Sequence, residues 1–284
     1  MSFAANPRAN RLLAALPQAE LRCWLPQLEW VALPLGQVLY ESGMSLSHAY
    51  FPTSAIIPLL YVTQDGATSE IAVVGNEGVV GIPMLMGGKT TTSRAMVQVA
   101  GEGFRIKAQA LKDAFDRPGV VKDLLLRYTM ALMTETAQTA VCNRHHTVDQ
   151  HLCRWLLQCL DRLPGKDIVI TQELIAHMLG VRREGVTDSA LKLQKAGLIS
   201  YTRGHIRVLD REGLEKRVCE CYAVVKKEYD RLLPETLGEV AEDGKSRFPR
   251  QAMDGLPLTG SPADTARQMR LPSVSSRAHS PAVM

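Results

Sequence analysis

The chain has 284 residues, of which 46% are hydrophobic and 22% charged, and its formal net charge at pH 7 is +4. This length fits about two domains, and the hydrophobic content supports a folded core. The small net charge identifies no nucleic-acid partner by itself. The sequence contains neither a secretory signal nor an apolar run of transmembrane length, so we expect a cytoplasmic protein with no membrane partner.

The six cysteines predict neither a disulfide framework nor a CxxC metal site, and we interpret them as reduced thiols. Four potential ligands for zinc or iron are spaced by four, three and four residues: Cys142, His146, Asp149 and Cys153. A helix break predicted at residues 143–147 separates them. Cys219 and Cys221 are two residues apart on a predicted helix and therefore point in different directions. The sequence thus predicts no metal site and no cofactor.

The N-terminal part of the chain is predicted to be mainly β-structure. Residues 10–25 indicate short helices interrupted by Pro17, and from Trp30 to about Ile106 short β-rich runs alternate with turn residues. This pattern is typical of an antiparallel roll or sandwich. The runs are Val38–Tyr40, Ile56–Ile57, Leu59–Val62, Ile71–Val74 and Met96–Val99. Gln64-Asp65-Gly66-Ala67 is the clearest hairpin turn.

Helical character returns at residues 108–115, and a longer helix is predicted from Val120 to about Asn143. Seven of its side chains alternate steps of four and three, which is coiled-coil spacing: Val121, Leu125, Tyr128, Leu132, Glu135, Thr139 and Cys142. We expect this helix to pair two copies of the chain. Because Glu135 and Thr139 weaken the seam, the alternative is a helix that packs only on its own β domain. Another helix is predicted at residues 147–163.

The segment from Ile170 to Leu209 predicts two helices and a hairpin. Thr171 can cap the first helix, and Gly180 can adopt the left-handed conformation that ends it. A second amphipathic helix follows, and two strand-like runs at residues 198–201 and 205–208 flank a turn with Gly204. This order predicts a winged helix-turn-helix, whose second helix enters the major groove of DNA.

Charge in this segment supports a DNA-binding role. Six basic residues lie between Arg182 and Arg207, against two acidic ones, and this excess suits phosphate contacts. The alternative is a winged helix that binds protein, with solvated charges. The predicted DNA-contacting residues are Thr171, Gln172, Arg182, Arg183, Glu184, Thr187, Asp188, Lys192 and Arg203.

The C-terminal part of the chain changes character at Pro234. A last amphipathic helix is predicted at residues 211–233. Beyond it, residues 234–284 contain six prolines and a single aromatic residue, Phe248. Such a segment cannot bury enough apolar surface to offset its ordering entropy, so we expect disorder.

A β roll, a long pairing helix and a winged helix-turn-helix, in this order, resemble the Crp/Fnr family of bacterial transcription regulators. The resemblance covers about residues 10–233. It is most specific where three motifs fall at the family's spacing: Leu179-Gly180-Val181, Arg183-Glu184 and Gly197-Leu198-Ile199. It implies an α+β fold with a cyclic-nucleotide-binding-like roll at residues 1–118, a dimerisation helix at 119–146, a winged helix-turn-helix at 147–233 and a tail at 234–284.

The resemblance also implies function and residue roles. A homodimer is expected to bind a palindromic promoter site in double-stranded DNA, with RNA polymerase as a further partner. Arg183 and Glu184 occupy base-contacting positions, and arginine can donate two hydrogen bonds to guanine while glutamate accepts one from cytosine. Asp188 stands where another arginine is frequent, and Arg182 where a helix-capping serine is common. The sequence contains no P-loop, HExxH or GxSxG motif, so we do not expect an enzyme.

Family members that bind cyclic nucleotides use a glycine amide, a glutamate, and an arginine followed by a small hydroxyl residue. Gly81 and Arg94 match this pattern, whereas Ile82 replaces the glutamate and Ala95 replaces the hydroxyl residue. Isoleucine cannot accept the ribose hydrogen bond, and a buried polar group without a partner costs about 1–3 kcal/mol. We therefore expect no ordinary cyclic-nucleotide binding.

Another small effector remains compatible with the roll. If this effector is an anion, Gly81 and Arg94 are the candidate residues that bind it. The alternative is that Arg94 pairs with a local carboxylate such as Glu70 or Glu77. A ligand-sensing or protein-interaction scaffold, whose winged helix does not bind DNA, is the competing function.

Overall fold

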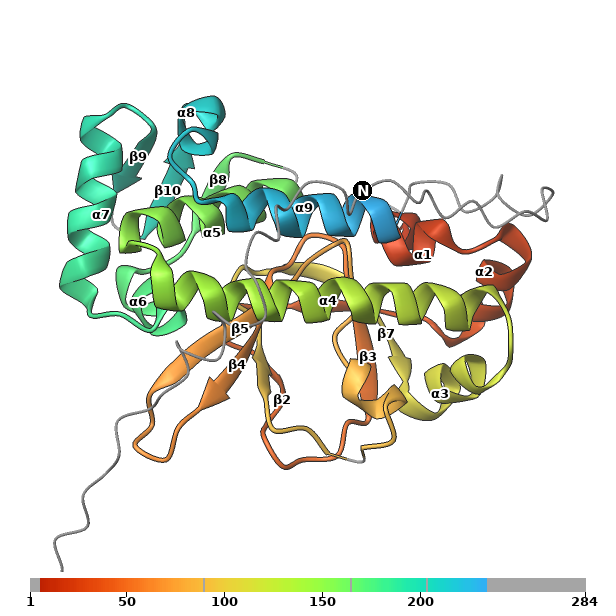
Figure 1. Cartoon of the computed structure of the whole chain (residues 1–284). Helices are drawn as coiled ribbons and strands as arrows, with labels where there is room; N and C mark the ends of the chain where they lie inside the picture. The colour runs from red at the N-terminus through yellow and green to blue at the C-terminus, as the bar shows by residue number, and fades with distance from the viewer. Residues whose placement is uncertain (1–5, 89, 164, 203, 234–284) are drawn as a thin grey trace, which may run out of the picture. The chain divides into compact units, whose positions relative to one another are not determined.

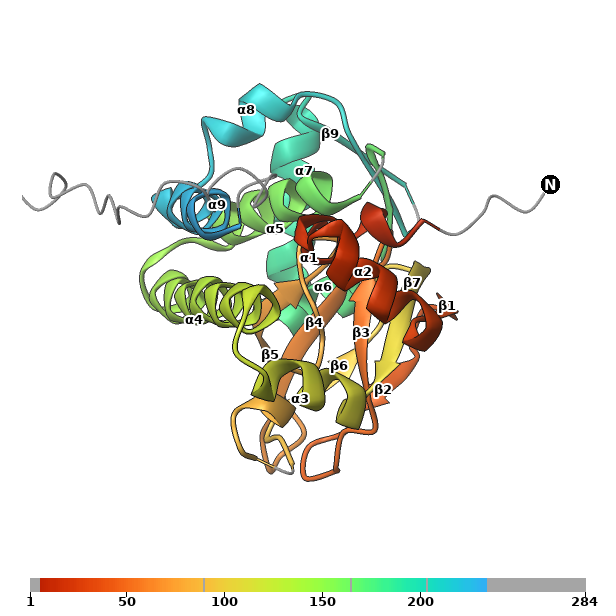
Figure 2. The ribbon, with the colours of Figure 1, turned by 90° about the vertical axis from the view of Figure 1, so that its right-hand side faces the viewer.

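The computed structural model describes residues 6–88, 90–163, 165–202 and 204–233. It begins with a 3-10 turn at Pro7–Ala9 and two short helices, α1 (Arg11–Ala15) and α2 (Gln18–Trp24), followed by a second turn at Leu25–Gln27. Pro17 is the N-cap of α2, as expected for a residue that interrupts helical structure. Both helices pack at one end of the β domain (Figure 2). There, Trp24 contacts Phe51 edge to face.

The β domain consists of two antiparallel sheets, which confirms the predicted roll (Figure 1). The strand order is β1-β7-β3 in one sheet and β2-β6-β4-β5 in the other. The strands are β1 (Glu29–Leu33), β2 (Val38–Tyr40), β3 (His48–Pro52), β4 (Ile57–Val62), β5 (Thr68–Val74), β6 (Arg94–Met96) and β7 (Gly101–Lys107). A 3-10 turn at Ile82–Leu85 follows β5.

Two details of the roll bear on the predicted strands. The turn between β4 and β5 is the predicted hairpin, and Gly66 has the positive φ of 86° that this turn needs. The run predicted from Met96 to Val99 was wrong in its bounds. Strand β6 ends at Met96, and Val99 makes an isolated bridge to Ile56.

Three helices follow the roll: α3 (Ala108–Asp116), α4 (Val120–His145) and α5 (Val148–Arg162). The predicted break between the last two helices is confirmed. The Thr147 side chain and the Gln150 side chain form a reciprocal capping box, which starts a new helix immediately after α4. Helix α5 is buried along most of its length, and its Trp155 side chain lies in a hydrophobic core.

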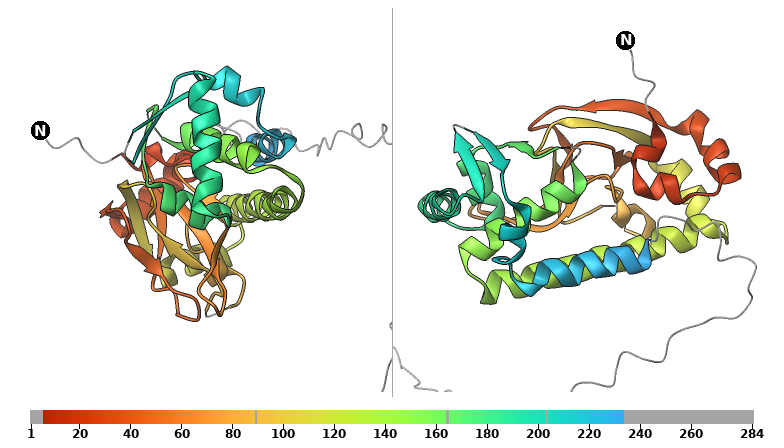
Figure 3. Two further views of the ribbon diagram at one scale, coloured as in Figure 1. Left: turned by 90° about the vertical axis from the view of Figure 1, so that its left-hand side faces the viewer. Right: turned by 90° about the horizontal axis from the view of Figure 1, so that it is seen from above.

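The predicted coiled-coil seam of α4 faces the interior of the chain. Its members are buried except Leu132, which is half-buried. The reason is that α9 (Glu220–Leu232) lies alongside α4, while the roll covers another side of the helix (Figures 1 and 3). The Tyr128 and Tyr229 rings meet edge to face in this contact. The prediction that this seam pairs two copies of the chain was therefore wrong.

The predicted winged helix-turn-helix is present. It contains α6 (Gln172–Leu179), α7 (Arg183–Lys195) and a three-stranded sheet. The strands are β8 (Asp167–Val169), β9 (Ile199–Thr202) and β10 (His205–Val208), and their order in the sheet is β8-β10-β9. The helix predicted at residues 211–233 is two helices, α8 (Arg211–Glu215) and α9, because the chain is extended at Cys219. The tail predicted to be disordered, residues 234–284, lies outside the described residues.

A buried polar network joins the roll to the helices that carry the winged domain. Arg162 Nε lies 2.8 Å from Glu77 Oε1, and Arg162 Nη2 lies 3.5 Å from Glu135 Oε2. Tyr229 Oη and Gln158 Nε2 donate hydrogen bonds of 2.8 and 3.0 Å to the Glu135 carboxylate. Burial raises the pKa of Glu135. The network therefore connects the turn after β5 with α4, α5 and α9.

No helix within the described ranges is both long and apolar enough to span a bilayer.

Candidate nucleic-acid interface and effector cavity

The two helices of the helix-turn-helix begin and end as their sequence predicts. The Thr171 hydroxyl accepts a hydrogen bond of 3.2 Å from the Leu174 amide, and Gly180 has φ 61° and ψ 32°. The buried side chains of Ile175 and Val186 belong to the same core as Trp155. This core fixes α7 on the outside of the domain.

One side of α7 is exposed over its whole length (Figure 3). The exposed residues include Arg182, Arg183, Glu184, Asp188 and Lys192. Arg182 is the N-cap and makes no side-chain capping bond, which agrees with its departure from a capping serine. Within the described residues, the side chains of Arg183, Glu184 and Asp188 form no hydrogen bond or ion pair. They are available to a ligand.

Thr187 and Gln172 lie between the two helices. Thr187 Oγ1 donates to Gln172 Oε1 at 3.1 Å and is 3.0 Å from the Arg183 carbonyl oxygen. Both residues are half-buried. Their side chains therefore tie α6 to α7, in addition to any contact that they make with DNA.

Asp149 holds α7 from its other side, a role that the sequence did not reveal. Ser189 Oγ donates to Asp149 Oδ1 at 2.5 Å, and Lys192 Nζ lies 3.4 Å from Asp149 Oδ2. The sequence signal for this contact was Ser189, a small polar residue at a helical position that packing buries. Lys192 remains exposed beside this contact.

The wing contributes a further basic side chain, although an acidic residue pairs with it. Arg207 Nε and Nη2 donate to the two oxygens of Asp167 at 2.7 and 2.9 Å. Gly204 has the positive φ of 84° that closes the turn between β9 and β10. Arg203, which was predicted to contact DNA, lies outside the described residues.

A cavity of about 610 Å³ opens between the roll and α4. Its walls come from the strands, the turn that contains Gly81 and Ile82, the segment at Thr90–Ser93, and the α4 residues Met133 and Ala137. Apolar and hydroxyl groups dominate, and none of its described lining residues is charged. Ile82 lines the cavity, so the side chain that replaces the family's glutamate faces this space.

Gly81 and Arg94 differ in their relation to this cavity. Gly81 is part of the lining and has φ 125°, which favours glycine. Arg94 Nε lies 3.2 Å from Glu41 Oε1. The alternative in which Arg94 pairs with a local carboxylate is thus present, but Glu70 and Glu77 were the wrong partners, because Glu77 pairs with Arg162.

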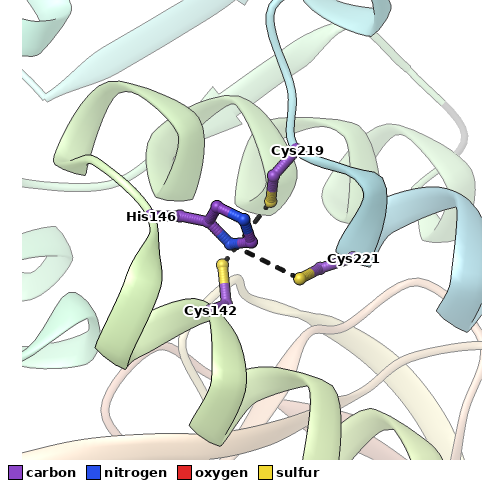
Figure 4. A group of neighbouring side chains, drawn as sticks. All are labelled: Cys142, His146, Cys219 and Cys221. Carbon is purple, nitrogen blue, oxygen red and sulfur yellow. Dashed lines mark hydrogen bonds between the residues drawn. The ribbon is translucent and has the colours of Figure 1, made fainter. Parts of the chain in front are cut away.

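The helix break separates two of the four metal-ligand candidates from the others, whereas the sequence analysis expected the whole set to scatter. Asp149 contacts α7, and Cys153 is buried in the hydrophobic core. However, Cys142 and His146 remain together and are joined by two further cysteines (Figure 4).

The expectation that Cys219 and Cys221 point apart was wrong. Cys219 is the N-cap of α9 and Cys221 lies in its first turn, so the regular helical spacing does not apply between them. The hydrogen bond from the Cys142 thiol lowers the pKa of Cys219.

The family models agree with this architecture. A model of the cyclic nucleotide-binding domain matches residues 30–117, and a model of the Crp-like helix-turn-helix domain matches residues 150–217. Two solved structures share the fold. FixK2 from Bradyrhizobium japonicum has a TM-score of 0.59 at 16% identity, over 68% of this chain and 98% of FixK2. A putative crp/fnr-family regulator from Eubacterium rectale has a TM-score of 0.58 at 17% identity, over 74% of this chain and 98% of that protein. The chain is a Crp/Fnr family regulator.

The Crp/Fnr assignment confirms the resemblance inferred from the sequence. A third structure with this fold is TTHB099 from Thermus thermophilus, with a TM-score of 0.55 at 17% identity, over 66% of this chain and 95% of TTHB099. No curated protein sequence matches the chain. Its helix-turn-helix makes this Crp/Fnr protein a DNA-binding transcription regulator.

Proposed function

We propose that this regulator binds a palindromic promoter site in double-stranded DNA as a homodimer, and that RNA polymerase is its further partner. The observation that carries the proposal is the exposed face of α7, whose Arg183 and Glu184 side chains have no described partner. We divide the chain accordingly into a sensor domain at residues 1–118, a dimerisation helix at 119–146 and a DNA-binding domain at 147–233.

The chemistry of α7 assigns different contacts to different side chains. Arg183 suits a guanine edge, and Glu184 and Asp188 suit the amino group of cytosine. Arg182 and Lys192 suit phosphates, which positions the helix without sequence preference. Thr171 and Gln172 begin α6, and the positive end of this helix suits a phosphate of the DNA backbone. Arg203 remains a predicted phosphate contact of the wing.

The dimer surface that we propose lies on the exposed side of α4. Five apolar residues there are exposed and alternate steps of four and three: Leu126, Met130, Met133, Ala137 and Ala140. The helix thus carries two seams of coiled-coil spacing, one covered by the chain itself and one uncovered. Pairing through the uncovered seam can set the two α7 helices about 34 Å apart, which matches successive major grooves.

For the roll, we propose a small effector that is not an ordinary cyclic nucleotide. Support comes from the cavity, whose described lining offers apolar and hydroxyl groups and includes Ile82. Gly81 lines this space, and Arg94 supplies a nearby cation for an anionic effector only when Glu41 releases it. Calorimetry with cyclic AMP and cyclic GMP checks the proposal, since micromolar binding of either contradicts it.

The test of DNA binding is a selection of genomic fragments by the purified protein, followed by gel shifts on the recovered sites. We expect a palindromic motif and binding that weakens with salt. Arg183→Ala should abolish the sequence preference, while Arg22→Ala, an exposed arginine on α2, should leave it intact. Failure to recover any motif favours the protein-interaction scaffold instead. If Arg183→Ala keeps the sequence preference of Arg22→Ala, Arg183 is the wrong base-contacting residue.

A further inference from the structure

Four side chains with metal-binding atoms converge where α4 ends and α9 begins (Figure 4). Cys142 lies in the last turns of α4 and His146 is its C-cap, while Cys219 and Cys221 start α9. Their sulfur and nitrogen atoms all lie within 4.8 Å of one another. Two segments that are far apart in the sequence thus supply two ligands each.

Two distances within this cluster match the edges of a tetrahedral site around one ion. Cys142 Sγ and Cys219 Sγ are 3.6 Å apart, and Cys221 Sγ lies 3.6 Å from His146 Nδ1. With Zn–S bonds of about 2.3 Å and Zn–N bonds of about 2.0 Å, a tetrahedral site requires S–S edges of about 3.8 Å and S–N edges of about 3.6 Å. These two edges are therefore spaced for a single ion rather than for a cluster of several irons, and the other ligand atoms lie within 4.8 Å.

The histidine is oriented as a metal ligand commonly is. Its Nδ1 faces the sulfur atoms, whereas Nε2 lies 3.3 Å from Glu220 Oε1. A carboxylate on the outer nitrogen fixes the ring orientation and leaves the inner nitrogen free to coordinate. Because Glu220 lies between Cys219 and Cys221 in the sequence, one short segment provides two ligands and the supporting carboxylate.

Burial and charge also favour a bound ion. The three thiols are almost completely buried, and the His146 side chain is largely covered. Arg154 is buried nearby, donates to Thr139 Oγ1 at 3.2 Å, and forms no salt bridge with a described residue. A buried guanidinium requires compensating negative charge. A zinc ion with three thiolates and one neutral imidazole carries a net charge of −1, which supplies it.

We propose that Cys142, His146, Cys219 and Cys221 bind one zinc ion. Four protein ligands leave no open position, so this is a structural site. It fastens the start of α9 to the end of α4, next to the break that leads into α5. The DNA-binding domain is thereby linked to α4 at two points, through the chain at His146 and through the metal at the start of its last helix.

The first experiment measures metal in the full chain, purified without a metal-binding tag. Elemental analysis by mass spectrometry should find about one zinc per chain. Cys221→Ser and Cys219→Ser should reduce zinc at least several-fold, whereas Cys23→Ser, which removes an exposed thiol outside the cluster, should retain it. Zinc-free wild-type protein, stoichiometric iron in place of zinc, or full zinc in Cys221→Ser overturns the proposal.

A second measurement keeps the test informative if the serine variants do not fold. His146→Cys should still bind one metal, because four thiolates also form a zinc site. After cobalt substitution, its thiolate-to-cobalt absorption should rise by about one third over wild type, from three thiolates to four. Unchanged absorption overturns the assignment of His146. A Cys142–Cys219 disulfide, trapped by alkylation at lysis, overturns the site as a whole.

Discussion

Arg162 and Glu77 form an ion pair of 2.8 Å between the end of α5 and the turn after β5, and each side chain is only 6% exposed. The same guanidinium approaches Glu135 on α4, and Glu135 accepts a hydrogen bond from Tyr229 on α9. Gly75 permits this approach, since a Cβ there would lie 2.7 Å from Arg162 Cδ. The pair therefore secures the roll against the helices that carry the winged domain.

Arg162→Met should destabilise the protein by about 3–5 kcal/mol, because it leaves two buried carboxylates without their cation. The matched control is Arg105→Met, which breaks the 2.7 Å pair with Glu29 on the surface of the roll. That exposed pair should contribute only about 0–1 kcal/mol. Urea unfolding measures both changes. Equal losses in the two variants contradict the role given to Arg162.

Glu70 should make stability depend on pH. It is buried on β5, near Arg154, Arg162 and Glu135, and burial raises its pKa from 4.5 to about 8. The folded state therefore holds a proton that the unfolded chain releases near pH 4.5. Its contribution is fully present below pH 4.5 and is lost as the pH rises through about 8, a loss on the order of 5 kcal/mol.

Glu70→Gln should remove this dependence, because the amide does not ionise. The variant should gain stability relative to wild type between pH 4.5 and 8, with little difference at lower pH. Thermal unfolding across this range measures the effect. Glu102→Gln changes an exposed carboxylate on β7 and is the control. A constant difference between Glu70→Gln and wild type at every pH contradicts the prediction.

Lys192→Ala should weaken binding to all DNA sequences alike, because the side chain is assigned to a phosphate. The slope of log affinity against log salt should become shallower by about 0.9, the value for one neutralised phosphate. Salt titrations of the gel shift provide the measurement. Lys112→Ala is a suitable comparison, since Lys112 pairs with Asp116 on α3. A change of preferred sequence without a change of slope assigns Lys192 to a base instead.

Met133→Glu should separate the proposed dimer into monomers, because it places a charge in the apolar seam of α4. Met44→Glu is closely matched, since both methionines are 59% exposed and Met44 lies in a turn of the roll. Light scattering at micromolar concentration distinguishes the two. Wild-type protein that is monomeric, or a Met133→Glu dimer of unchanged stability, contradicts pairing through this face.

The sequence predicted those parts of the structure that local chemistry determines. The Thr171 cap and the Gly180 turn act within a few residues, so α6 and α7 appeared where spacing placed them. The roll followed from short strands and frequent turns. Arg182, Arg183, Glu184 and Asp188 were placed on the exposed face by the same helical period.

Long-range packing decided the features that the sequence did not predict. Helix α4 has two seams, and the positions of α9 and of the roll determine which one the chain covers. Likewise, Cys142 and Cys219 are brought together by the break between α8 and α9, which no turn residue marks. A search for ligand spacing in one stretch of sequence cannot find a site that two distant segments share.

Helix α7 is held from both sides, by Gln172 through Thr187 and by Asp149 through Ser189. A helix fixed in this way loses little conformational freedom when it enters the major groove of DNA, so ordering the helix costs little binding free energy. The same fixation prevents the helix from tilting to suit a different base pair. A change of target sequence must therefore come from replacing exposed side chains such as Arg183, and the half-site should tolerate few mismatches at the position they contact.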